Sequence, residues 1–108
     1  MLHDVDVRQL RALQAIAQEG SFGRAAERLG FTQSAISQQI AGLERAVGDR
    51  VFDRPGGPKR VELTPTGVLL LDYATSVFEQ LRITEDGLRS LRAGEVGRLV
   101  VGSFQSVS

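Results

Sequence analysis

The hydrophobic residues of the first 48 positions recur every three or four residues, and Gly20, Gly30 and Gly48 interrupt them. This spacing is typical of amphipathic helices, and glycine ends a helix readily because it adopts a positive φ without strain. Each segment also follows a polar residue that can accept hydrogen bonds from the free N–H groups of a first helical turn. The pattern therefore predicts three short helices with the N-caps Asp6, Ser21 and Thr32.

The third predicted helix, which should end at Val47, has two unlike faces. Its apolar residues form one stripe at helical spacing: Ile36, Ile40, Leu43 and Val47. Its other face carries short polar or small side chains: Gln33, Ser34, Ser37, Gln38 and Ala41. A solvated helix normally favours Glu and Lys, so this face is suited to close approach to another molecule.

The helical spacing ends after Gly48. Residues 51–54 and 60–64 are short candidate strands. The segment 55–59 between them reads Pro-Gly-Gly-Pro-Lys, a composition typical of a hairpin loop. We therefore expect a two-stranded hairpin at this point of the chain.

A long helix is predicted to follow the hairpin. Thr64 can act as its N-cap and Pro65 as its first residue, a position at which the missing N–H of proline costs nothing. The helix should continue to Arg92, shortly before Gly94. One more short strand is expected at 98–102, with no evident partner strand in the sequence.

Together these elements predict a mainly α fold. Ala26, Gly30 and Ile36 have the spacing of a helix-turn-helix, in which a small residue lets two helices cross, glycine forms the turn and an apolar residue joins the helices. That spacing also occurs in ordinary helical domains. The preceding helix and the following hairpin favour a winged helix-turn-helix, with three helices and a two-stranded wing, followed by a long helix.

The composition excludes several classes of protein. Thirteen basic and thirteen acidic residues give a formal net charge of zero, which argues against binding to nucleic acid by bulk charge, although local basic patches can still exist. The longest apolar run, 68–71, is too short to cross a membrane, and the N-terminus lacks a secretion signal, so we expect a cytoplasmic protein. The chain has no Cys and only His3, and it lacks a nucleophile–base pair, a metal cluster and a cofactor loop. We therefore expect no enzyme activity, no metal and no cofactor.

Seven short stretches then follow one another in a specific order: RQL (8–10), GSF (20–22), AAERL (25–29), TQSAISQQI (32–40), LE (43–44), VFDR (51–54) and LTPTG (63–67). In this order they resemble the N-terminal domain and linker helix of LysR-type transcriptional regulators. The resemblance covers residues 6–92. It implies a bacterial transcriptional regulator whose third helix enters the major groove of double-stranded DNA.

The resemblance also implies which residues contact DNA. Base contacts in the major groove would come from Gln33, Ser34, Ser37 and Gln38. Contacts with the DNA backbone, from the second helix and around the wing, would come from Arg24, Thr32, Arg50, Arg54, Lys59 and Arg60. A glutamine amide can pair with adenine, and a helix N-terminus can hold a phosphate. For Arg50 and Arg54 the alternative is local ion pairing with Asp49 or Asp53.

Two positions depart from a pattern that many relatives follow. Ser34 stands where they carry Pro, and Gln38 stands where they carry Arg. Without that long cation, we expect a preference for adenine at position 38 rather than a phosphate or guanine contact. These differences should change which operator is bound rather than whether DNA is bound.

The long helix carries more apolar surface than one small domain can cover. A main stripe follows a three–four spacing, with Thr84 in the one polar place between Leu81 and Leu88: Leu70, Ala74, Val77, Leu81, Leu88 and Leu91. A second stripe, Leu71 and Phe78, lies beside it. Two apolar faces require two partners, which we take to be the winged domain and a second subunit. The resemblance likewise implies a homodimer or higher homo-oligomer, and a symmetric dimer would bind an inverted repeat.

The expected domain organisation follows from these elements. Residues 1–64 would form the DNA-binding domain, 65–93 the linker and dimerisation helix, and 94–108 the first strand and turn of an effector-binding domain that is otherwise missing. We therefore expect a DNA-binding fragment that binds no small-molecule effector. The alternative function is a winged-helix module for protein–protein interaction, and zero net charge gives this alternative weight. Salt separates the two, because DNA affinity falls steeply with ionic strength.

Overall fold

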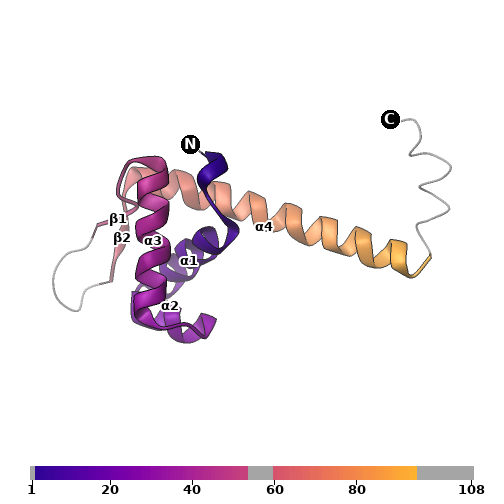
Figure 1. The fold of residues 1–108 in the computed structure, drawn as a ribbon, viewed down its shortest axis with the longest axis horizontal. Helices are drawn as coiled ribbons and strands as arrows, with labels where there is room; N and C mark the ends of the chain where they lie inside the picture. Colours follow the sequence, from indigo (N-terminus) through magenta and orange to yellow (C-terminus); the bar gives the residue numbers. More distant parts are fainter. Residues whose placement is uncertain (1, 54–59, 95–108) are drawn as a thin grey trace. The chain divides into compact units, whose positions relative to one another are not determined.

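A computed structural model of the chain describes residues 2–53 and 60–94 (Figure 1). The chain divides into two compact units, Met1–Thr75 and Ser76–Ser108. The helices are η1 (Leu2–Asp4, a 3-10 turn), α1 (Val7–Glu19), α2 (Phe22–Leu29), α3 (Gln33–Val47) and α4 (Pro65–Arg92); the strands are β1 (Phe52–Asp53) and β2 (Glu62–Leu63). This is the predicted winged helix-turn-helix followed by a long helix.

The predicted caps of the first three helices are confirmed. Asp6 accepts a hydrogen bond from the Arg8 N–H (2.7 Å), and the Gln9 side chain accepts one from the Asp6 N–H (3.0 Å), which completes a capping box. Ser21 and Thr32 accept hydrogen bonds from backbone N–H groups in the same way, at 3.1 and 3.0 Å. The glycines that end α1, α2 and α3 have φ values of 79°, 76° and 78°, so each adopts the left-handed conformation.

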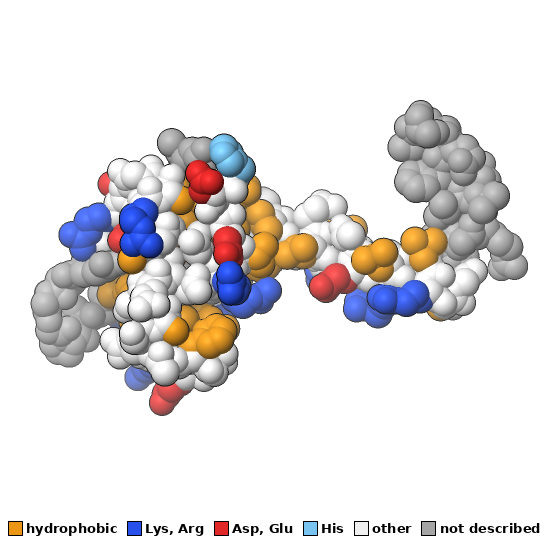
Figure 2. All heavy atoms as spheres, in the orientation of Figure 1, with side chains coloured by type: hydrophobic (Ala, Val, Ile, Leu, Met, Phe, Trp, Pro, Cys, Tyr) orange, Lys and Arg blue, Asp and Glu red, His pale blue; other side chains and the backbone are white. Residues whose placement is uncertain are grey.

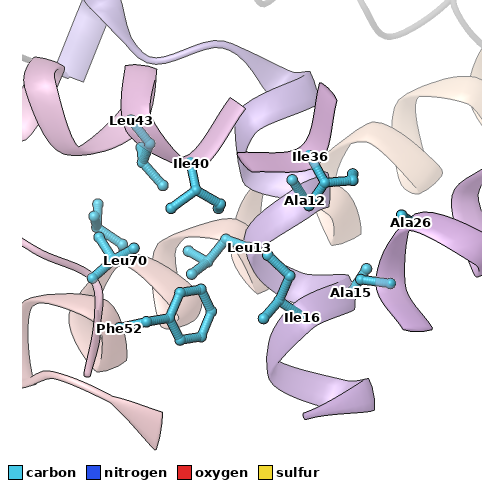
Figure 3. Packing of buried hydrophobic residues seen from close by; sticks show 12 residues of the cluster. Ala12, Leu13, Ala15, Ile16, Ala26, Ile36, Ile40, Leu43, Phe52 and Leu70 are labelled. Carbon is cyan, nitrogen blue, oxygen red and sulfur yellow. The ribbon is translucent and has the colours of Figure 1, made fainter. Parts of the chain in front are cut away.

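The core lies where α1, α2 and α3 pack against one another. Its largest fully buried side chains are Leu13, Ile16, Ile36, Ile40, Leu43, Val51 and Phe52. Figure 3 shows the Phe52 ring of β1 pointing toward Leu13 and Ile16 of α1. The ring also meets Phe22 in a T-shaped contact, with 5.7 Å between ring centroids. Val47, predicted in the buried stripe of α3, is only half-buried at the end of the helix.

The wing is an antiparallel pair in which Phe52 is opposite Leu63 and Asp53 is opposite Glu62. The described strands are two residues long, shorter than the predicted 51–54 and 60–64. The predicted hairpin loop at 55–59, which includes Lys59, lies outside the described residues, as do Arg54 and the predicted strand at 98–102.

Helix α4 begins and ends where the sequence predicts. Thr64 caps it, because its hydroxyl accepts a hydrogen bond from the Gly67 N–H at 3.0 Å. In the second unit, Arg82 pairs with Glu79 (2.7 Å) and Asp86 (3.1 Å) along the exposed helix surface. Arg82 lowers the pKa of Glu79 through a hydrogen bond and charge attraction. No helix among the described residues is long and apolar enough to cross a membrane.

The main apolar stripe of α4 requires a correction. Leu70 is buried in the core of the first unit, and Ala74 has no exposed surface either. These two residues were predicted at the dimer interface, but the chain itself covers them. The large exposed apolar side chains on this part of α4 are instead Val68, Leu69 and Tyr73, and Leu69 is 72% exposed.

Candidate nucleic-acid interface

Helix α3 has one buried face and one exposed polar face, as the sequence predicts. Ile36, Ile40 and Leu43 fix the buried face to the core. The four predicted base-contacting side chains, Gln33, Ser34, Ser37 and Gln38, are all exposed. No charged residue occurs in the helix before Glu44. The exposed face therefore presents amide and hydroxyl groups at close range, without long cations to hold a partner at a distance.

The N-terminal turns of α3 and α2 lie next to each other. The Gln33 amide oxygen would lie 3.5 Å from a Cβ placed on Gly23 in the first turn of α2. Arg24, one residue further along α2, is exposed and forms no ion pair with another described residue. Thr32 is also exposed, and its hydroxyl oxygen accepts the Ala35 N–H. Predicted base-contacting and backbone-contacting residues thus lie together at the N-terminal end of α3.

Arg60 lies against the turn between α1 and α2. The Val61 N–H donates a hydrogen bond to the Gly20 carbonyl at 3.1 Å, which joins the wing to this turn. A Cβ on Gly20 would lie 2.4 Å from the Arg60 Cζ, the end of a flexible side chain that can move aside, so glycine is favoured there by its φ of 79° rather than by space. The exposed Arg60 side chain therefore lies near Ser21, the residue that caps α2.

Arg50 lies at the base of the wing and is exposed. The predicted alternative, an ion pair with Asp49, is absent from the described residues. Asp49 instead accepts hydrogen bonds from the Arg50 backbone N–H (2.8 Å) and from the Thr66 hydroxyl (2.5 Å). These bonds lower the pKa of Asp49, with the larger effect from Thr66.

Sequence reasoning missed two features of this region. Phe31, in the turn before α3, is 53% exposed beside Thr32, and only its place between Gly30 and the cap could have indicated this. The contact between Asp49 and Thr66 joins residues 17 positions apart, and no local pattern indicates it.

Charge is dispersed over the face of the molecule that Figure 2 shows. Figure 2 shows basic and acidic side chains interspersed on one face, without a continuous basic field. The described residues contain no group of three or more His, Cys, Asp or Glu side chains that could hold a metal ion. The part of the site that the structure describes therefore offers polar recognition with a few separate arginines.

Curated proteins that are similar to this chain include transcriptional regulators. One similar relative is a "Probable RuBisCO transcriptional regulator" of Cyanophora paradoxa, 45% identical over 98 residues, which are 91% of this chain and 30% of the relative. Another is the "HTH-type transcriptional regulator IlvR" of Caulobacter vibrioides, 41% identical over 96% of this chain and 34% of the relative. The chain thus spans about a third of the length of these curated relatives.

Solved structures give the same result. The DNA-binding domain of BenM, in a complex with catB site 1 DNA, has a TM-score of 0.77 and 29% identity, covering 83% of this chain and 95% of that one. The CbnR DNA-binding domain in its DNA complex has a TM-score of 0.73 and 30% identity, covering 81% and 98%. Residues 7–68 match the family described as "Bacterial regulatory helix-turn-helix protein, lysR family". The chain therefore belongs to the LysR family and carries the DNA-binding domain of a LysR-type transcriptional regulator.

Proposed function

We propose that this chain binds double-stranded DNA sequence-specifically through the exposed face of α3. The observation that carries the proposal is the two-sided character of that helix, in which an uncharged polar face is fixed in place by three fully buried residues. The DNA complexes of BenM and CbnR, which have the same fold, support it. With no membrane-spanning helix among the described residues, we also propose that the protein acts in the cytoplasm.

The chemistry of α3 supports base recognition in the major groove. Gln33 and Gln38 can each offer a donor and an acceptor to adenine N7 and N6, and Ser34 and Ser37 can donate to or accept from bases at shorter range. Glutamine at position 38 favours adenine over guanine, because it lacks the fixed pair of donors with which arginine binds guanine O6 and N7.

Contacts with phosphates would position this face on the duplex. Arg24, Arg50 and Arg60 are exposed and form no ion pair with another described residue, so their charges are available. The Thr32 hydroxyl can donate to a phosphate while its oxygen caps α3. Arg54 and Lys59 remain predictions from the sequence. Because these cations are few, base contacts should supply a larger share of the affinity than in a strongly basic domain.

Replacing Gln38 with Ala should weaken binding to the operator by about 1–3 kcal/mol while leaving binding to random DNA nearly unchanged. The physical reason is that the amide contacts a base edge, which only the operator presents in the correct order. The operator is first selected from random DNA, and both affinities are then measured by fluorescence anisotropy. Gln80→Ala, at an exposed position of α4, is the matched control and should have no effect.

If Gln38→Ala lost equal affinity for the operator and for random DNA, base recognition by Gln38 would be contradicted. The same titrations at several salt concentrations test the alternative function, a protein-interaction module. DNA binding loses affinity steeply with salt, whereas a mainly apolar protein interface does not. If the chain selects no DNA sequence at any salt concentration, the proposed function is wrong.

We further propose that the chain acts as a dimer on an inverted repeat, with 1–64 as the DNA-binding domain and 65–93 as the dimerisation helix. Because the chain covers Leu70 and Ala74, we assign their places to Leu69 and Tyr73, which are exposed. The resulting row again has gaps of three or four residues: Leu69, Tyr73, Val77, Leu81, Thr84, Leu88 and Leu91. Such a row forms one apolar face suited to a second helix.

Replacing Leu88 with Glu should weaken self-association by about tenfold or more, because a carboxylate would be buried in the subunit interface. Leu88 is 50% exposed in the single chain, so the change should leave the fold intact. Ile83→Glu is the matched control, since Ile83 is 48% exposed and lies about 140° away around the helix. Sedimentation equilibrium measures both dissociation constants. Equal weakening by the two variants would contradict the assigned face.

A further inference from the structure

A hydrogen-bonded cluster holds the backbone of Arg50 on both sides. The Arg50 N–H donates to Oδ1 of Asp49 at 2.8 Å, and the Arg50 carbonyl accepts from the Thr64 hydroxyl at 2.6 Å. The other carboxylate oxygen of Asp49 accepts from the Thr66 hydroxyl at 2.5 Å. Thr64 caps α4 and Thr66 lies in its first turn, so both hydroxyl groups come from the start of this helix.

The residue after Arg50 is held equally firmly. The Val51 N–H donates to the Glu44 carboxylate of α3 at 3.0 Å, and the Val51 carbonyl accepts from the Thr64 N–H at 3.0 Å. Val51 itself is fully buried. The backbone at 50 and 51 is therefore bonded to the end of α3 on one side and to the start of α4 on the other.

The side chain of Arg50 is the part of this cluster without such bonds. Arg50 is exposed, and within 2–53 and 60–94 no hydrogen bond or ion pair of its guanidinium is present. Its nearest acidic neighbour in sequence, Asp49, already has both oxygens bonded to other groups. A fixed backbone with an unpaired cation is pre-organised for an external anion, because little backbone entropy is lost on binding.

We propose that Asp49, Thr64 and Thr66 are positioning residues that hold Arg50 for contact with a DNA phosphate. Asp49 forms the link, since it binds the Arg50 N–H through one oxygen and α4 through the other. The placement of the first turn of α4 thereby sets the position of a DNA contact at the base of the wing. This inference rests on the proposed DNA-binding function.

Thr66→Val tests the inference, because it removes the hydroxyl and keeps the shape of the side chain. Operator affinity should fall about fivefold, because a phosphate contact is lost. For the same reason, log affinity should fall less steeply with log salt concentration. Arg50→Ala should reduce that slope by about one. In the Arg50→Ala background, Thr66→Val should have no further effect on either quantity. Thr66→Ser, which restores the hydroxyl, should recover the original affinity and slope.

A Thr66→Val effect of the same size with and without Arg50 would overturn the positioning role, as would an Arg50→Ala variant that binds with unchanged affinity and slope. Thermal unfolding of each variant shows whether a loss of DNA affinity comes from a loss of folded protein. A variant that loses affinity in this way but keeps the original salt slope also counts against the inference. Failure of the unsubstituted chain to bind DNA would contradict the proposed function itself. These outcomes are distinct, because only the last concerns the unsubstituted chain.

Discussion

Replacing Phe52 with Ala is expected to lower the free energy of unfolding by about 3–5 kcal/mol. The Phe52 side chain is fully buried between the wing and the helices, and its ring meets Phe22 edge to face. Its removal would leave a cavity that the short strands cannot close. Urea unfolding followed by circular dichroism measures the change.

Phe31→Ala is the matched control for this prediction. It removes the same side chain from a position that is 53% exposed, so the loss should be less than about 1 kcal/mol. A similar loss in the two variants would show that the wing does not share the core of the helices. It would also contradict the assignment of Phe52 as a principal core residue.

Replacing Gly67 with Ala is expected to lower the free energy of unfolding by about 3 kcal/mol, although the change adds only one methyl group. A Cβ on Gly67 would lie 2.1 Å from the Val51 carbonyl oxygen, and backbone cannot move aside as a flexible side chain does. Relief would require α4 to shift away from the wing. That shift would also break the bond from the Thr64 N–H to the same carbonyl. Urea unfolding again gives the free energy, and operator affinity should fall with it.

Gly87→Ala provides the opposite case in the same helix. Nothing lies within 4 Å of a Cβ at Gly87, so alanine there should stabilise α4 by about 0.5–1 kcal/mol through its better helix propensity. The two substitutions are chemically identical, and only the surroundings differ. If Gly67→Ala also stabilised the protein, α4 would not be packed against the wing as closely as the structure indicates.

The neutral charge of the chain agrees with the way the candidate interface is built. The exposed face of α3 is uncharged before Glu44, and the described cations at the interface stand singly at Arg24, Arg50 and Arg60. We expect such a surface to have little sequence-independent affinity for DNA. We therefore expect the position of each arginine to matter more than the number of arginines, which is why the bonds that hold Arg50 are of functional interest.

The sequence alone determined the local structure and the face of α3. The caps at Asp6, Ser21 and Thr32 and the glycines after each helix act within a few residues, so their chemistry can be recognised without knowing the fold. The two-sided pattern of α3 is also local, because helical spacing alone assigns each side chain to a face. The family resemblance rested on the same segments, and it is confirmed.

Tertiary structure decided how α4 is used and which groups surround the arginines. Periodicity finds an apolar stripe but not its partner, and so Leu70 and Ala74 were placed at a subunit interface when the chain's own core buries them. In the same way, an ion pair with Asp49 was the alternative considered for Arg50, whereas the Asp49 side chain binds Thr66. Both outcomes depend on residues that are distant in sequence and meet only when α4 packs against the base of the wing. Local spacing cannot specify such contacts, because it contains no information about which segments meet.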